Sequence, residues 1–526
     1  MKIRGLPSGS FFCHWGFIVF SLLAVLSGFR IAADSQRWQL APLWEALLIS
    51  HQVFLWHLLA ALGISLTLTL YLSYLWLTGR WRRLWPEGLP WHGMGSLSRW
   101  LNLSGVLLLC LLALTGILTG SESAVSGAGV RDLHHWLAWT MLVYWLVHPL
   151  QKLLLWGWRA LLWLVRVRRL LPGPALGALV LLLAGGLLLL PYERLWRAGS
   201  LTVVATTQAP VLDGQSDDPA WQQAPTSTLY TKLGNDFPGA ATPVQVRGVS
   251  QGEMVYLLLQ WPDPDRSLTH IPLQKQAQGW RPLENGFSRD DEVTYYEDKL
   301  ALMLARDPLA ALLSIHLGRT PILGAPPSRS GRGYHYFSRG MADIWHWQAW
   351  RTDSLFQADD DYFSTPGPRV VCQKRYTAGY FKDPALGGGY TSNWDFYDSD
   401  GITPRRLPVD GRFTLNPAAQ GTAFALNGMR WTDSFPYTVA LDHWPAGTLM
   451  PSALSKAPLR GDRGDVRARG RWRDGLWTLE LARLQDTGSP FDVPLAAGTY
   501  LWVALFNHAQ TRHSYHLLPL QLRWAP

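Results

Sequence analysis

The stretch LHHWLAWTMLVYWLVHP, residues 133–149, is apolar enough to lie in a lipid bilayer, yet it contains three histidines. Fourteen residues separate His134 from His148. That spacing returns a helix to within about 40° of the same face and rises about 21 Å. His135 projects about 100° away from His134. A membrane-length helix with one histidine near each end of a single stripe predicts two polar sites, one near each membrane surface.

The composition of the 526-residue chain changes near residue 195, from Leu, Trp, Ala and Val to Asp, Pro, Gly, Arg and Tyr. The net charge is +9, but the basic residues of the first part gather in short loops between apolar runs. That pattern indicates membrane topology rather than nucleic-acid binding. The three cysteines form no CxxC or CxxCH motif, which leaves zinc ribbons, iron–sulfur clusters and covalently attached haem unsupported.

Five apolar runs are long enough to cross a bilayer, which takes about 20 residues. They are Phe11–Gly28, a run within Leu47–Leu77, Leu101–Thr119, Leu133–Leu155 and Leu170–Leu190. The basic loops alternate with weakly charged ones, which predicts a cytoplasmic N-terminus. Five crossings then leave everything after about residue 191 outside. In a bacterium this means the inner membrane with an exported, periplasmic C-terminal part.

Histidines inside membrane spans are costly and therefore indicate function. By depth, His14 in the first run matches His148, and either His51 or His57 in the second run matches His134. Neutral imidazole is a common axial ligand, so two stacked bis-histidine sites predict two b-type haems that carry electrons across the membrane. The alternative is a set of interfacial histidines or a proton path. We expect His135 and the unused histidine of the second run to be interfacial or supporting groups.

Four stretches resemble the bacterial cytochrome b561 and hydrogenase-type di-haem cytochromes b. They are HWGFIVFSLL from His14, WHLLAALG around His57, LSGVLLLCLLALTGILTG (103–120) and HHWLAWTMLVYWLVH (134–148). The resemblance covers about residues 10–160. It implies a four-helix core with one haem ligand from the first span, one from the second and two from the fourth. His57, with Ala61 four residues on, fits the second-span pattern better than His51. The resemblance also implies exchange of electrons with the quinone pool.

From about residue 200, short runs of alternating polarity between turn residues predict an antiparallel β-sandwich with long insertions at about 310–440. The acidic run Asp359–Asp361 fits a solvated turn better than a cation site. We interpret His270, His316, His335 and His346 as loop or surface residues.

Four further stretches resemble the haem-binding γ subunit of ethylbenzene dehydrogenase, a DOMON-like sandwich. They are VLDGQSDDPAWQQAP (211–225), YYEDKLALML (295–304), GMADIWHWQAWR (340–351) and FNHAQTRHSYHLLP (506–519). In that family Met and Lys hold one haem b. The Met maps to Met341, but no Lys follows Lys456. The resemblance therefore implies Met341 with His513, and His516 as the alternate. Residues three apart on a strand face opposite sides, so only one of these histidines can point inward.

The sequence thus predicts a four-helix transmembrane di-haem cytochrome b domain (1–165), a fifth transmembrane helix with a linker (166–197) and a periplasmic haem b domain (198–526). The predicted function is electron relay in a respiratory chain. It runs between the quinone pool and a periplasmic partner, either a molybdenum enzyme or a c-type cytochrome. An electron-transfer protein or oxidoreductase subunit is favoured over a stand-alone enzyme. The alternative is a membrane-anchored module that binds or senses a ligand.

Overall fold

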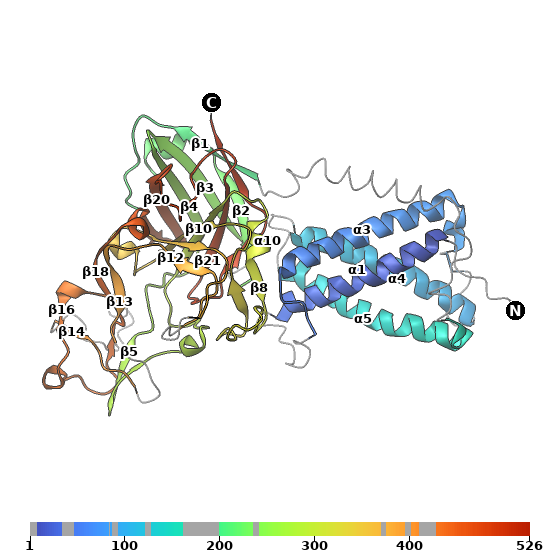
Figure 1. The fold of residues 1–526 in the computed structure, drawn as a ribbon, viewed down its shortest axis with the longest axis horizontal. Helices are drawn as coiled ribbons and strands as arrows, with labels where there is room; N and C mark the ends of the chain where they lie inside the picture. Colours follow the sequence, from blue (N-terminus) through green and yellow to red (C-terminus); the bar gives the residue numbers. More distant parts are fainter. Residues whose placement is uncertain are drawn as a thin grey trace. The chain divides into compact units, whose positions relative to one another are not determined.

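A computed structural model describes residues 8–33, 47–83, 85–86, 93–120, 128–160, 199–234, 241–369, 375–394, 401–409 and 428–525. The chain divides into two compact units, Met1–Leu195 and Trp196–Pro526. The first is helical and the second is built from β-strands (Figure 1). The predicted fifth span, Leu170–Leu190, lies outside the described residues.

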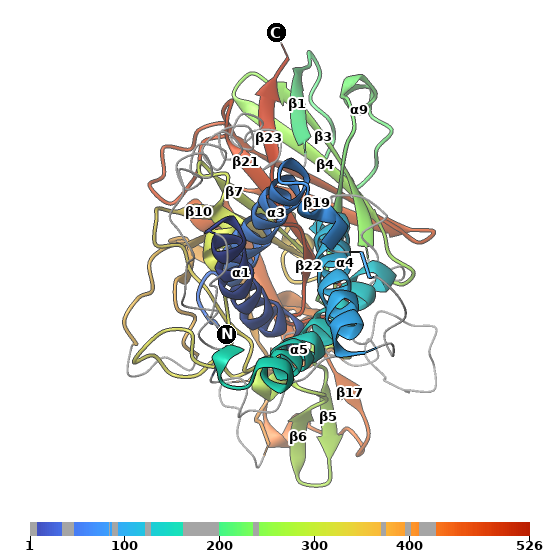
Figure 2. The same ribbon diagram turned by 90° about the vertical axis from the view of Figure 1, so that its right-hand side faces the viewer.

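Four long helices make up the described part of the first unit: α1 (Ser8–Ala33), α3 (Val53–Leu77), α4 (Met94–Gly120) and α5 (Ala128–Trp156). A short helix, η1 (Arg80–Arg83), follows α3. Seen nearly end-on in Figure 2, the four helices surround a common axis. Among the described residues, three stretches are long and apolar enough to cross a membrane: Ser10–Ala33, Val53–Leu77 and Met94–Gly120. Helix α5 is not among them, and it carries three histidines, Arg131, Asp132 and Lys152 along its length.

Small residues let these helices approach closely. A Cβ on Gly63 of α3 would lie 2.4 Å from the ring of Phe20 on α1. A Cβ on Gly105 of α4 would lie equally close to the hydroxyl of Tyr144 on α5. Because lipid tails are as apolar as leucine, helix association in a membrane depends on such close packing.

The second unit is dominated by a 13-stranded, mostly antiparallel sheet. Its main path runs β12 (Tyr380–Lys382), β11 (Asp359–Phe363), β10 (Ala342–Gln348), β7 (Lys299–Ala305), β21 (Tyr500–Phe506), β22 (Ser514–Tyr515), β2 (Ser227–Lys232), β3 (Ala241–Gln251), β4 (Met254–Pro262), β20 (Leu476–Leu484) and β19 (Arg467–Arg473). Strand β1 (Gly199–Ala205) pairs in parallel with β3 and with β23 (Leu520–Trp524).

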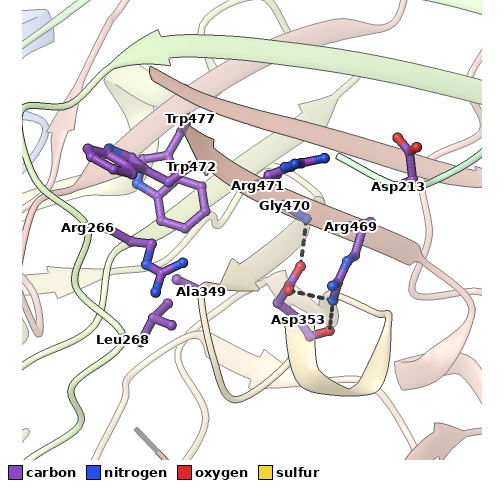
Figure 3. A pocket seen from close by; sticks show the side chains of 10 residues that line it. All are labelled: Asp213, Arg266, Leu268, Ala349, Asp353, Arg469, Gly470, Arg471, Trp472 and Trp477. Atoms are coloured by element: carbon purple, nitrogen blue, oxygen red, sulfur yellow. Dashed lines mark hydrogen bonds and ion pairs between the residues drawn. The ribbon is translucent and has the colours of Figure 1, made fainter. Parts of the chain in front are cut away.

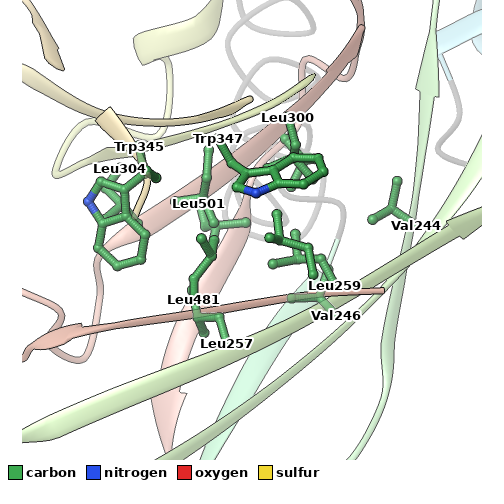
Figure 4. Packing of buried hydrophobic residues seen from close by; sticks show 14 of the residues in the cluster. Val244, Val246, Leu257, Leu259, Leu300, Leu304, Trp345, Trp347, Leu481 and Leu501 are labelled. Atoms are coloured by element: carbon green, nitrogen blue, oxygen red, sulfur yellow. The ribbon is translucent and has the colours of Figure 1, made fainter. Parts of the chain in front are cut away.

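The sheet folds over so that its two halves face each other across one core (Figure 4). Alternate residues of β10, β7 and β21 point into this core, where they meet the inward residues of β4 and β20. Trp345 and Trp347 of β10 are almost fully buried there. This is the predicted alternation, and it sends His346, which lies between the two tryptophans, to the opposite face.

Small sheets and short helices occupy the connections. They are β13 (Gly387–Ser392), β18 (Ala453–Arg460) and β15 (Met429–Arg430); β14 (Arg406–Pro408) and β16 (Ser434–Pro436); β17 (Leu449–Met450), β5 (Leu273–Gln276) and β6 (Gly279–Pro282); β8 (Ile315–Leu317) and β9 (Gly333–His335); and α9 (Pro219–Gln223), α10 (Ala310–Ser314), η4 (Phe287–Arg289), η5 (Asp353–Leu355), η6 (Trp431–Asp433), η7 (Val439–Leu441) and η8 (Asp462–Gly464). Most of these elements fall in or beside the predicted insertions at about 310–440.

The acidic run Asp359–Asp361 corrects one prediction. It is not a solvated turn, because all three residues lie within strand β11 and each is 0% exposed. The neighbouring strands β10 and β12 pair with it on both sides. Three consecutive acidic residues suggested a loop, but tertiary pairing outweighs the low strand propensity of aspartate.

Candidate functional site

The imidazoles of His57 on α3 and His134 on α5 lie edge to face inside the helical unit. Their ring centroids are 6.3 Å apart and their planes meet at 89°. Two imidazoles on opposite sides of one metal atom, each held by a bond of about 2 Å, have centroids about 6 Å apart. The observed separation therefore matches the space that one axially coordinated iron needs.

The other nitrogen of each ring is held by a neighbouring helix. Nδ1 of His57 lies 3.1 Å from the carbonyl oxygen of Ala24 and 3.0 Å from Oγ of Ser27, both on α1. Nδ1 of His134 lies 2.8 Å from Oγ1 of Thr115 on α4, whose hydroxyl donates to the carbonyl of Leu111. Both Nδ1–H groups are therefore donors, which assigns the lone pair of each ring to Nε2. Such outer hydrogen bonds orient metal-ligating histidines.

Two glycines leave room beside these rings. A Cβ on Gly28 of α1 would lie 3.0 Å from Cε1 of His57, and a Cβ on Gly116 of α4 would lie 3.4 Å from Cε1 of His134. Larger residues at either position would press on an imidazole edge. Helices α1 and α4 thus hold the two rings in two ways. They form hydrogen bonds to Nδ1 of each ring, and their glycine backbone lies close to Cε1.

The opposite end of α5 carries the second predicted pair. His14 near the start of α1 and His148 near the end of α5 are close enough to interact electrostatically. The hydroxyl of Tyr144 lies 3.2 Å from Nδ1 of His148 and its ring stacks on the imidazole. Lys152, one turn further along α5, donates to Oγ of Ser98 on α4. The structure therefore brings the four predicted histidines together as two pairs.

The two alternate histidines of this unit lie elsewhere. Nε2 of His135 accepts a hydrogen bond of 2.9 Å from Nε1 of Trp139, and its ring edge meets Phe29. His51 is exposed and precedes the first residue of α3. His57, not His51, therefore occupies the position opposite His134.

In the sheet unit the structure does not bring Met341 and His513 together. Met341 lies just before the start of β10, where Asp343 pairs with Leu304 of β7. At the other end of β10, Gln348 pairs with Lys299 of β7, and Lys299 in turn pairs with Phe506 of β21. The ring of His513 packs on Phe506 at 4.9 Å. Met341 and His513 are thus about seven residues, or roughly 23 Å, apart along the strands. Met341 packs against the core instead, so these two side chains cannot share one iron.

His516 is a structural residue. Its Nε2 accepts from the backbone N–H of Val503 at 2.8 Å, and its Nδ1 lies 2.7 Å from the carbonyl of Leu518. With both ring nitrogens engaged and the residue 3% exposed, His516 has no nitrogen left for a metal as it lies here.

His513 instead faces His335 of β9, with ring centroids 5.5 Å apart. Nδ1 of His513 donates to the carbonyl of Thr511, which leaves Nε2 as the nitrogen with the lone pair. Burial, together with the nearby His335, lowers the pKa of His513 to about 3, and burial lowers the pKa of His335 to about 4. Both imidazoles are therefore neutral at physiological pH, the form that binds metals.

Aromatic side chains surround this pair. Phe363 stacks on His335, and Phe506 and Tyr515 lie against His513. Nδ1 of His335 is buried and has no hydrogen-bond partner among the described residues. The pair is thus half-buried and neutral, lies among aromatic rings, and includes one buried nitrogen without a partner among the described residues.

His346 was also placed wrongly by the sequence reasoning. It lies on β10 rather than in a loop, its ring stacks on Phe506, and its buried Nε2 has no partner among the described residues. Burial and the Lys299 ammonium hold its pKa well below the usual range. The signal that could have found it is the alternation in Trp345–Trp347, which turns His346 away from the core. His270 and His316 are likewise buried rather than exposed.

A separate pocket of about 320 Å³ opens beside β19 and β20 (Figure 3). Its walls combine the indoles of Trp472 and Trp477 with the guanidinium groups of Arg266, Arg469 and Arg471. Asp353 accepts hydrogen bonds from Arg469 and from the backbone of Gly470, as the dashed lines mark. Burial raises the pKa of Asp353 to about 6.

Comparisons with known proteins bear on the sheet unit. A family model described as ethylbenzene dehydrogenase matches residues 218–517, more than half of the chain. No curated protein matches the sequence. A family 9 carbohydrate-binding module from Caldicellulosiruptor kristjanssonii in complex with glucose covers 62% of this chain and 95% of its own, with 7% identity and a TM-score of 0.23. A putative carbohydrate-binding protein from Bacteroides uniformis covers 62% and 99%, with 9% identity and a TM-score of 0.25.

Proposed function

Because the chain belongs to the ethylbenzene dehydrogenase family, we propose that it is a membrane-bound b-type cytochrome, related to the haem-bearing subunits that serve molybdenum enzymes. It relays electrons between the quinone pool and a periplasmic partner. Two intramembrane bis-histidine haems and one haem b on the sheet unit carry the electrons. The N-terminus is cytoplasmic and the membrane is the bacterial inner membrane. The partner is a molybdenum enzyme or a c-type cytochrome.

The observation that carries this proposal is the pair His57 and His134, whose rings stand 6.3 Å apart with both Nδ1 atoms held by other helices. That arrangement leaves two Nε2 lone pairs for one iron. A haem held there supplies one-electron chemistry through its iron. The surrounding side chains and backbone fix the orientation of the two rings.

The second pair, His14 and His148, would hold the other membrane haem about 21 Å along α5. With Nε2 of His148 on the iron, Nδ1 would carry the proton and donate to the hydroxyl oxygen of Tyr144, which orients that ring. On the sheet unit, the neutral imidazoles of His335 and His513 support a haem site better than the pairing of Met341 with His513. Met341 is therefore not proposed as a ligand.

Substituting His134 tests the proposal, with the adjacent His135 as a matched control. In His134→Ala we expect loss of one b haem, seen as a smaller reduced-minus-oxidised difference spectrum with one redox transition missing. In His135→Ala we expect the full spectrum, because His135 bonds to Trp139 and not to His57. An unchanged spectrum in His134→Ala, or equal losses in both variants, would contradict the proposal.

A ligand-binding sandwich on a membrane anchor is the second candidate, and the pocket between Trp472 and Arg266 favours it. An indole face beside guanidinium groups suits a sugar ring or an acidic group. Calorimetric titration with neutral and acidic oligosaccharides tests this role. Binding that Trp472→Ala abolishes, in a chain without b-type spectra, would favour this function over electron transfer.

A further inference from the structure

A cluster of aspartates lies at the end of the sandwich core, away from the histidine pairs. Strand β10 contributes Asp343 and strand β11 contributes Asp360, which points to the core side of the sheet, opposite to Asp359 and Asp361. Carboxylate oxygens of Asp343, Asp360 and Asp492 all lie within 4.8 Å of one another. The carboxylate of Asp383 adjoins that of Asp492. That of Asp465 adjoins Asp360.

One cation, Arg483, already lies beside this cluster, which we call the aspartate cluster (Asp343, Asp360, Asp383, Asp465 and Asp492). Its Nη1 is 2.7 Å from Asp343 and 3.5 Å from both Asp360 and Asp492. Its Nη2 donates to the carbonyl of Val493, and its guanidinium lies 4.7 Å from the ring centre of Trp345. One guanidinium leaves the five carboxylates with an excess of four negative charges when all are ionised.

Many oxygens of the cluster receive no N–H group and meet other carboxylates instead. Seven carboxylate oxygens are buried without a hydrogen-bond partner among the described residues. They are both oxygens of Asp360 and of Asp383 and the Oδ1 atoms of Asp343, Asp465 and Asp492. Asp360 is 0% exposed, so water cannot satisfy it from outside. Unsatisfied buried polar groups are rare in folded proteins and call for a specific explanation.

Shared protons can hold part of the cluster together, because Asp383 lies within hydrogen-bonding reach of Asp492, and Asp465 within reach of Asp360. A divalent cation removes the same repulsion and also coordinates the buried Oδ1 of Asp343, which has no partner among the described residues.

We propose that the aspartate cluster binds a structural calcium ion. Calcium takes six to eight oxygen ligands at about 2.3–2.6 Å, so two oxygens bound to the same ion are at most about 5 Å apart. The carboxylate oxygens of Asp343, Asp360 and Asp492 lie within 4.8 Å of one another, which agrees with this distance. Magnesium demands a strict octahedron of shorter bonds and usually keeps several bound waters. A buried set of carboxylates leaves no room for those waters. The ion joins β10 and β11 to the segment that carries Asp492.

This proposal does not depend on haem binding, and its test uses the purified full chain in detergent after treatment with EDTA. Calcium chloride is titrated into the protein, and the thermal unfolding of the sheet unit is measured at each calcium concentration. At calcium one hundred times its dissociation constant, we expect the Tm to rise by about 5 °C, and by less with magnesium. Terbium, which substitutes for calcium, should show luminescence sensitised by Trp345.

Two variants locate the ion. Asp360→Asn should abolish the calcium-dependent rise, whereas Asp361→Asn should keep it, because Asp361 lies on the opposite face of the same strand and bonds to Tyr380. If the cluster binds protons and no calcium, Asp360→Asn should raise the Tm, and calcium should leave the Tm of the wild-type chain unchanged. The proposal is overturned if the wild-type chain shows no calcium response, if Asp360→Asn keeps it, or if Asp361→Asn loses it. Should Asp360→Asn not fold, the calcium response and calcium content of the wild-type chain still decide.

Discussion

At the scale of the residue, the hydrogen bond from His134 to Thr115 separates a ligand from an ordinary buried histidine. The spacing of His134 and His148 places them on one stripe of α5, because helix geometry alone fixes which face a residue occupies. The choice between His51 and His57 stayed open in the residue pattern. It depends on where α3 begins, and only the structure gives that boundary.

Removing the outer hydrogen bond of His134 gives a graded test. In Thr115→Val we expect the haem to bind about tenfold more weakly, because outer partners of this kind typically contribute 10–100-fold. The midpoint potential should rise, since an imidazole without an acceptor on Nδ1 donates less electron density to iron. Haem titration and potentiometry measure both effects. Thr69→Val, on the exposed face of α3, is the control and should change neither.

His513 and His516 should respond oppositely to substitution. In His513→Ala we expect loss of the haem of the sheet unit with little change in stability. In His516→Ala we expect the free energy of unfolding to fall by about 2 kcal/mol, because the N–H of Val503 is left without its acceptor. Haem content and thermal unfolding of each variant decide. Loss of haem in His516→Ala alone would reverse the assignment.

At the scale of the element, the helices were predictable from their apolar runs, whereas the strand at Asp359–Asp361 was not. Five neighbouring carboxylates and an arginine come together from two stretches of the chain, 343–383 and 465–492. No local sequence pattern predicts that these stretches lie side by side. The error at Met341 has a similar cause. A resemblance supplies residue types in order, but strand register decides which of them are neighbours.

The contact between α1 and α3 predicts an unusual sign for a glycine substitution. Glycine to alanine in an exposed helix normally stabilises it, by up to about 1 kcal/mol. In Gly63→Ala we expect destabilisation by about 1–3 kcal/mol, because the new Cβ would lie 2.4 Å from Phe20.

Thermal unfolding in detergent measures the effect of Gly63→Ala. Gly95→Ala is the matched control, since its Cβ would meet nothing within 4 Å, and it should be neutral or slightly stabilising. Equal behaviour of the two variants would show that α1 and α3 do not pack as described.

At the scale of the whole molecule, the pH dependence of stability should differ between the calcium-free and the calcium-bound aspartate cluster. The raised pKa values of Asp383 and Asp465, about 8 and about 7, mean that the folded chain binds more protons than the unfolded one above about pH 4. Their stabilising contribution is present below that pH and is lost as the pH rises through 7 and 8.

In EDTA the Tm of the sheet unit should therefore fall between about pH 5 and 8. In calcium the fall should be smaller, because the ion replaces the lost protons. Glu480, whose pKa burial raises to about 7, lies outside the cluster and contributes to both curves, so the difference between them is the quantity to measure. Parallel curves would contradict calcium binding at the aspartate cluster.

The central claim is that one chain joins a membrane cytochrome to an exported haem unit. Haem stoichiometry of the purified full chain, combined with a redox titration, tests it most directly. We predict three b-type haems per chain with three resolvable transitions, two of which disappear when His134 and His148 are both substituted by alanine. A chain without b-type haem, or one whose transitions survive that double substitution, would contradict the account.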